Sequence, residues 1–167
     1  MGIAGFMTGP ATGSVDSGGL LPVAGGSVGL ADAVATVAAG EALGEGLRGG
    51  EVIALIGALG AGKTHFSKGI ARGAGFAGGE VTSPTFSLVQ EYRGGRLPVF
   101  HFDFFRMEAA ADVLALGWDE YAEAGGVCVV DWADRFPELM PEGVQWWLLE
   151  PDEGGGRRLT RLTEVVS

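Results

Sequence analysis

The chain has 167 residues, a length that predicts one domain large enough to bury a hydrophobic core. Its 21 acidic residues outnumber its 11 basic ones, and the formal net charge of −10 argues against a surface that binds nucleic acid by itself, since this requires a basic footprint. The single cysteine, Cys128, excludes an internal disulfide, and no apolar run approaches the roughly 20 residues of a membrane span, so we expect a cytoplasmic protein with no membrane segment.

The first part of the chain has the composition of a tail. Residues 1–29 are rich in glycine, proline, serine and threonine and have no hydrophobic period. Such a segment buries too little apolar surface to offset the entropy lost on ordering, so we expect a flexible tail over residues 1–29 and a folded domain over residues 30–167. Residues 30–47 have the apolar spacing of a helix, with Thr36 on its small and apolar face. A threonine in that setting usually serves packing, unless the face meets a bound nucleotide.

The next segment has the pattern of a phosphate-binding loop. Val52–Ile56 is an unbroken apolar run, typical of a strand buried on both faces, and residues 57–64 spell G-x-x-x-x-G-K-T. Phe66, Ile70 and Ala74 follow at a spacing of four, which predicts a short helix. Glycines let backbone amides converge on an anion, and a helix N-terminus adds a favourable dipole. A chance motif in a glycine-rich chain is the alternative, but the agreement of both flanks favours a functional loop.

This loop predicts ATP and Mg²⁺ as ligands. Lys63 is expected to reach the β- and γ-phosphates, and the Thr64 hydroxyl to coordinate magnesium. The sequence has no asparagine, and hence no N-K-x-D element for reading guanine, which favours ATP over GTP. The residues expected to bind the nucleotide through the loop are Gly57, Gly60, Ala61, Gly62, Lys63 and Thr64.

Beyond the loop helix the sequence predicts a β-hairpin. Pro84 forces an extended backbone at Ser83, and residues 86–92 then read as a strand. A glycine turn separates this strand from an antiparallel partner over residues 97–102. The rest of the chain predicts one alanine-rich helix and three strands, over residues 108–121, 127–131, 144–149 and 159–165. The predicted fold is therefore α/β, a P-loop NTPase-like mixed sheet flanked by helices, with antiparallel additions.

Asp131 is the candidate acid of the metal site. It follows four apolar residues, so a buried strand delivers its carboxylate to the carboxyl edge of the sheet, where open α/β sheets bind ligands. Together with Thr64, Asp131 could hold magnesium directly or through water, as the acid of a Walker B element does. An aspartate that merely caps a strand end is the alternative, but the phosphate loop favours the metal role.

Three more polar residues, His101, Asp103 and Arg106, lie in the aromatic run F-H-F-D-F-F-R. Strand alternation places His101 and Asp103 on one face and the first two phenylalanines on the other. Burying an unpaired polar group costs roughly 2–7 kcal/mol, which points to a function for this group. The alternative is purely structural: Asp103 pairs with His101 or Arg106 to stabilise the end of the strand. The residues alone support the functional and the structural interpretation equally.

These motifs, in this order, resemble the bacterial TsaE family, the small P-loop ATPases of tRNA threonylcarbamoyladenosine biosynthesis. The matching stretches are L-G-A-G-K-T at 59–64, V-T-S-P-T-F-S-L-V-Q-E-Y at 81–92, H-F-D-F-F-R at 101–106, L-G-W at 116–118 and V-D-W-A at 130–133. The resemblance covers residue 31 to the C-terminus and omits the tail. A P-loop alone is common to many proteins, whereas this series of motifs is highly specific.

The resemblance implies a function and a set of partners. It implies a magnesium-dependent ATPase that acts with the TsaB–TsaD complex, which transfers a threonylcarbamoyl group to the adenosine beside the anticodon. Because the loop has no acid at position 58 to align water, we expect turnover to be slow without that complex. The chain would then meet tRNA only through that complex, in agreement with its acidic balance. A small-molecule P-loop kinase and a nucleotide-sensing regulatory module are the alternatives, although a kinase usually needs an arginine-bearing lid and the chain has no obvious insertion of that kind.

The resemblance also implies roles for single residues. It makes Lys63, His101, Asp103 and Arg106 the catalytic group and Asp131 a magnesium ligand. Thr36 and Thr85 would lie beside the nucleotide, with Thr85 in a switch near the γ-phosphate. Apart from the resemblance, Arg157 belongs to the one local basic cluster, with Arg158 and Arg161. Arg157 could contact phosphates or an acidic partner surface, but a solvated strand edge is the favoured interpretation of this cluster.

The chain departs from the family at three positions. It has Ala58 where the family often has aspartate, Phe105 where it has tyrosine, and Asp131 where it has glutamate. The last change retracts the carboxylate by about one bond.

Overall fold

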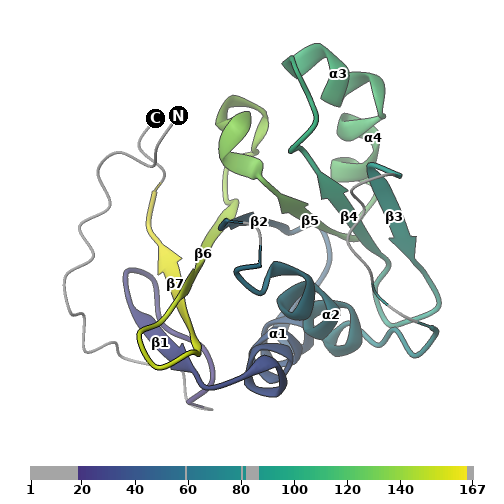
Figure 1. Cartoon of the computed structure of the whole chain (residues 1–167). Helices are drawn as coiled ribbons and strands as arrows, with labels where there is room; N and C mark the ends of the chain where they lie inside the picture. Colours follow the sequence, from purple (N-terminus) through teal and green to yellow (C-terminus); the bar gives the residue numbers. More distant parts are fainter. Residues whose placement is uncertain (1–18, 59, 80, 82–86, 165–167) are drawn as a thin grey trace.

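The computed structural model describes residues 19–58, 60–79, 81 and 87–164 (Figure 1). These residues form a mixed sheet with the strand order β1-β7-β6-β2-β5-β4-β3. Strands β6, β2, β5 and β4 run parallel, whereas β1, β7 and β3 pair antiparallel at the two edges. The strands are β1 (Ser27–Leu30), β2 (Val52–Ile56), β3 (Val89–Tyr92), β4 (Val99–Asp103), β5 (Val127–Asp131), β6 (Gln145–Pro151) and β7 (Arg157–Leu162). The predicted α/β class, with a mixed sheet and antiparallel additions, is confirmed.

Helices cover both faces of this sheet. The described helices are α1 (Ala33–Gly46), α2 (Lys63–Gly73), α3 (Ala110–Ala115) and α4 (Trp118–Glu123), with short 3-10 helices η1 (Ala133–Arg135) and η2 (Pro137–Leu139). Helices α1 and α2 lie together on one face, and α3 and α4 on the other (Figure 1). None of the helices in the described part of the chain combines the length and apolarity needed to cross a membrane.

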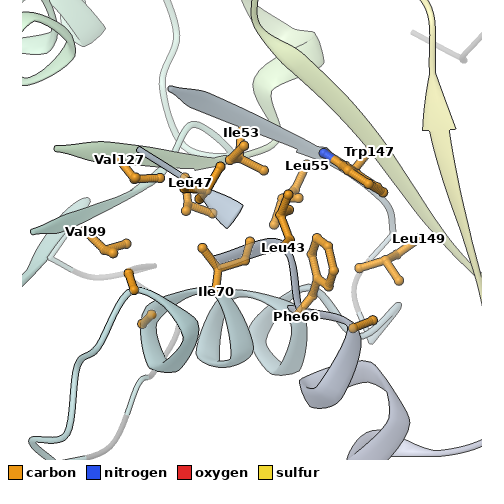
Figure 2. Close-up of a cluster of buried hydrophobic side chains, with 14 of the residues drawn as sticks. Leu43, Leu47, Ile53, Leu55, Phe66, Ile70, Val99, Val127, Trp147 and Leu149 are labelled. Carbon is orange, nitrogen blue, oxygen red and sulfur yellow. The ribbon is translucent and has the colours of Figure 1, made fainter. Parts of the chain in front are cut away.

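The alternation of β2 divides the core into two layers. Ile53 and Leu55 pack toward α1 and α2, and the remaining residues of β2 pack toward α4. Figure 2 shows the first layer, where Phe66 and Ile70 of α2 meet these β2 side chains beside Trp147 of β6. Fully burying an aliphatic or aromatic side chain of this size contributes about 1.5–3 kcal/mol, so the layer anchors α2, and with it the loop that precedes α2, to the sheet.

Helices α1 and α2 touch through their backbones. A Cβ added to Gly69 of α2 would lie 2.1 Å from the Val37 carbonyl oxygen, and one added to Gly40 of α1 would lie 2.2 Å from that of Phe66. Gly44 and Gly73 form the next such contact one turn along. Glycine is required at these positions because no side chain fits between the helices. The contact fixes the start of α1 beside the phosphate loop.

The strands β3, β6 and β7 differ from the predicted bounds by a few residues, and two larger differences concern the kind of element. The predicted tail is wrong for residues 27–29, which belong to β1 and pair antiparallel with β7; residues 1–18 lie outside the described part of the chain. The predicted helix over residues 108–121 is two helices, because Gly117 adopts a φ of 90° that ends α3 and begins α4. The segment around Ser83 and Thr85 is also outside the described residues.

Candidate functional site

The phosphate loop joins the carboxyl end of β2 to the N-terminus of α2. Its glycines are needed for the path of the backbone, since Gly60 and Gly62 have φ values of 78° and 101°. Gly57 is constrained differently, because a Cβ there would lie 2.7 Å from the Leu149 carbonyl oxygen. α2 begins at Lys63, so its first amides face the ligand side of the loop.

A cavity of about 600 Å³ lies against this loop. It brings together ten residues that the sequence and the resemblance single out: Thr36, Gly60, Ala61, Gly62, Lys63, Thr64, Asp103, Arg106, Asp131 and Arg157. Gly57 and His101 do not line it, and Thr85 lies outside the described residues. The remaining lining residues, not anticipated as ligand contacts, are Asp32, Ala33, His65, Phe105, Trp132, Gly155 and Gly156.

Lys63 lies at the centre of an electrostatic cluster. Its Nζ donates a hydrogen bond to the Gly57 carbonyl and lies 4.1 Å from the centre of the Trp132 ring. Burial lowers the pKa of Lys63, and the carboxylates of Asp131, Asp103 and, more weakly, Asp134 act in the opposite direction. The cavity thus joins one buried cation to several acids, which is the environment expected where both a polyphosphate and a metal ion bind.

Asp131 ends β5 with its side chain buried, at 3% exposure. Its Oδ1 is buried without a hydrogen-bond partner among the described residues, and both Asp131 and Thr64 line the cavity. A buried carboxylate oxygen without a donor is costly unless a cation meets it. The described residues hold no cluster of three or more His, Cys, Asp and Glu for a metal. Mg²⁺ nevertheless fits, because it commonly binds through one or two carboxylates plus the phosphates of its nucleotide.

The β4–β5 register determines how the second predicted group is arranged. Asp103 pairs with Asp131 across the two parallel strands, and the Phe104 amide donates to the Asp131 carbonyl at 3.0 Å. The Asp103 carboxylate accepts a hydrogen bond from the Phe105 amide at 2.9 Å. His101 is 1% exposed and lies against Asp131, with 3.3 Å between its Nε2 and Oδ2 of the carboxylate.

Arg157 of β7 and Thr36 of α1 both lie beside the phosphate loop. Arg157, at the start of β7, donates to the carbonyls of Gly60 at 2.9 Å and Gly156 at 3.0 Å. Thr36, in the first turn of α1, donates from its hydroxyl to the Asp32 carbonyl at 3.1 Å. A Cβ on Gly62 would lie 3.7 Å from both side chains. Arg157 is therefore not at a solvated strand edge: it ties the β6–β7 turn to the phosphate loop.

Comparison with known proteins decides the family. The family model described as "Threonylcarbamoyl adenosine biosynthesis protein TsaE" matches residues 30–159. The chain belongs to the TsaE family. Its relatives include two proteins named "tRNA threonylcarbamoyladenosine biosynthesis protein TsaE". The one from Bacillus subtilis is 47% identical over 93 residues, which cover 56% of this chain and 57% of that protein. The one from Treponema pallidum is 40% identical over 121 residues, 72% of this chain and 88% of that protein.

A solved structure supports the same family at the level of the fold. The crystal structure of Bacillus subtilis YdiB has a TM-score of 0.67 to this structure and 32% sequence identity, and the match covers 81% of this chain and 82% of that one. The resemblance read from the motifs is confirmed. The B. subtilis sequence match, however, spans little more than half the length of that relative.

Residues that sequence reasoning missed in this TsaE-family site come mainly from the turn after β5. Trp132 has a φ of 58°, which is unusual for a residue other than glycine. The centres of the Trp132 and Phe105 rings lie 4.9 Å apart. Arg135 donates to the Phe105 carbonyl and so braces the loop that carries Asp103 and Arg106. The acid–Trp pair gave a signal for Trp132. Arg135 had none, because its partner is a backbone group 30 residues away.

Proposed function

We propose that this protein binds ATP with Mg²⁺ and hydrolyses ATP, and that it does so in threonylcarbamoyl modification of the adenosine beside the anticodon of tRNA. The observation that carries the proposal is that Lys63, Thr64, Asp103 and Asp131 line the same cavity. Membership of the TsaE family supports the pathway. The absence of asparagine supports ATP over GTP as the nucleotide.

The residues of the cavity divide the work of binding and hydrolysis in this proposal. The loop amides and Lys63 bind the phosphates, and Thr64 and Asp131 would hold Mg²⁺, which when bound neutralises charge on the transferred phosphoryl group. Asp103 orients the attacking water, from a position held by its hydrogen bond with the Phe105 amide. Arg106 lines the same cavity and either locks its loop or contacts a partner. Thr36 and Arg157 fix the sides of the nucleotide site.

We further propose that hydrolysis is slow until a TsaB–TsaD-type complex completes the site. Ala58 leaves the loop without a carboxylate to align water. In phosphoryl transfer, positioning and charge stabilisation supply most of the rate, and one group added by a partner can contribute about 10³–10⁵-fold. Contact with tRNA through the complex agrees with the net charge of −10. A role in tRNA modification supports a cytoplasmic location as part of this proposal.

The test measures hydrolysis of labelled ATP by thin-layer analysis, alone and with the cognate complex. Lys63→Ala should abolish nucleotide binding, and Asp103→Ala should abolish turnover while ATP still binds. Lys68→Ala is the matched control, because this lysine is on the same helix but does not line the cavity. Phosphate transfer to a small acceptor would indicate a kinase, and binding without turnover in the complex would indicate a sensor; either result refutes the proposal.

A further inference from the structure

His101 has an unusual environment for a histidine in a nucleotide site. It is 1% exposed, does not line the cavity, and neither ring nitrogen makes a hydrogen bond within the described part of the chain. It faces the α2 side of β4, whereas Phe100 and Phe102 on the other face pack edge-on against Tyr121. An unsatisfied buried imidazole costs a few kcal/mol relative to an apolar side chain of similar size, roughly 2–7 for such groups. Packing alone therefore does not account for a histidine here.

The neighbouring carboxylate supplies the missing explanation. Nε2 of His101 lies 3.3 Å from Oδ2 of Asp131, and both side chains are nearly inaccessible to solvent. The other carboxylate oxygen, Oδ1, has no hydrogen-bond partner among the described residues, and Asp131 lines the cavity. The two oxygens thus differ: Oδ2 lies against the imidazole, and Oδ1 accepts no hydrogen bond from any described residue.

We propose that His101 is a positioning residue for Asp131 rather than a group that acts on the nucleotide. The inference rests on the proposed function, since it assigns His101 to the orientation of the carboxylate that would hold Mg²⁺. The imidazole restrains Oδ2 and so leaves Oδ1 for the metal. Outer-shell side chains that orient a metal-binding residue commonly contribute about 10–100-fold to metal affinity.

The geometry separates this role from two others. A residue that activates water or contacts the γ-phosphate must reach the cavity, and His101 does not line it. A support for Asp103 would lie against that carboxylate, but the contact of His101 is with Asp131, and Asp103 accepts from the Phe105 amide. His101 therefore acts on the site through Asp131.

The experiment titrates Mg²⁺ in the full-length protein. Three quantities are measured: the affinity for a fluorescent ATP analogue in EDTA, the Mg²⁺ concentration for half-maximal tightening of that affinity, and ATP turnover with the partner complex at saturating Mg²⁺. His101→Leu should raise the half-maximal Mg²⁺ concentration about 10–100-fold, with little change in EDTA affinity or in saturated turnover. His101→Gln, which retains an N–H donor, should recover part of the loss.

Phe100→Leu is the control for disturbance of β4, because it is buried on the opposite face of the same strand. It should lower the melting temperature without moving the Mg²⁺ midpoint. An unchanged midpoint with reduced saturated turnover in His101→Leu would make His101 a catalytic residue and overturn the proposal. A midpoint shift in Phe100→Leu equal to that in His101→Leu would assign the effect to general destabilisation. If the wild-type protein binds no ATP, or binds it independently of Mg²⁺, the proposed function fails separately.

Discussion

Replacing Gly69 with alanine tests whether the contact of α1 and α2 holds the site together. The new Cβ would lie 2.1 Å from the Val37 carbonyl oxygen and 2.8 Å from both the Glu41 nitrogen and the Gly40 Cα. Real contacts of a Cβ essentially never fall below 3.0 Å, so the helices must separate by about 1 Å. All three atoms belong to the backbone of α1, so no side chain can turn aside to make room.

The expected loss of stability follows from this geometry. Overpacking of a close-packed interior costs about 1–3 kcal/mol, and alanine returns up to about 1 kcal/mol through its helix propensity. We expect a net loss of about 2 kcal/mol, because rigid backbone lies on both sides of the added methyl group. In a domain of this size this lowers the melting temperature by about 4–8 °C. Separation also moves Thr36 away from Gly62, so ATP affinity should fall together with stability.

Urea unfolding and calorimetric ATP binding measure the two effects. Gly46→Ala is the matched control, because Gly46 is on α1 and a Cβ there meets nothing within 4 Å. That variant should be as stable as wild type or slightly more stable, with unchanged ATP affinity. If Gly69→Ala unfolds at the same urea concentration as Gly46→Ala, α1 and α2 are not in rigid backbone contact at Gly69.

Three further predictions concern single side chains. Asp131→Asn should weaken Mg²⁺-dependent ATP binding by about 10- to 100-fold in calorimetry. It should also lower the pKa of Lys63 further, because Asp131 is the strongest of the carboxylates that raise this pKa. Arg96→Met should cost about 1–2 kcal/mol in urea unfolding, with unchanged ATP affinity, since Arg96 donates to the Leu47 and Gly44 carbonyls at the end of α1. Burial raises the pKa of Cys128 from 9.0 to about 12, so its thiol should resist iodoacetamide at pH 8 until the protein unfolds. Because the thiol ionises more readily in the unfolded chain, the free energy of unfolding should fall as pH rises from 9 toward 12.

The phosphate loop was predictable from the sequence because its determinants are local. β2 has the predicted bounds, and α2 starts at Lys63, directly after the glycines that shape the loop. The motif, the apolar strand and the helical stripe all lie within one continuous segment, so no distant contact was needed. The same holds for β5, which ends at Asp131 as its apolar run predicts.

Elements that depend on distant partners were not predictable. β1 is a four-residue strand containing serine and glycine, and it forms because β7, far along the chain, offers a ladder from Arg157 to Thr160. The helix break at Gly117 was missed because alanine-rich flanks favour one continuous helix, whereas glycine adopts the left-handed conformation that turns the chain. The position of Thr36 at the cavity followed from the family resemblance, not from composition or spacing. The contact of Arg157 with the Gly60 carbonyl joins residues 97 positions apart in the chain, so the local basic cluster alone favoured a solvated strand edge instead.

The contact between His101 and Asp131 also depends on residues distant in the sequence, and it leads to a last prediction. Alternation placed His101 beside Asp103, but only the β4–β5 register brings it to Asp131. Asp131→Glu would move the carboxylate about one bond farther out and away from the imidazole. In a double-mutant cycle with His101→Leu, residues in contact typically couple by about 0.5–3 kcal/mol. We expect His101→Leu to shift the Mg²⁺ midpoint strongly in the wild-type background and only slightly in the Asp131→Glu background. Equal shifts in both backgrounds would mean that His101 acts on the metal site without passing through Asp131.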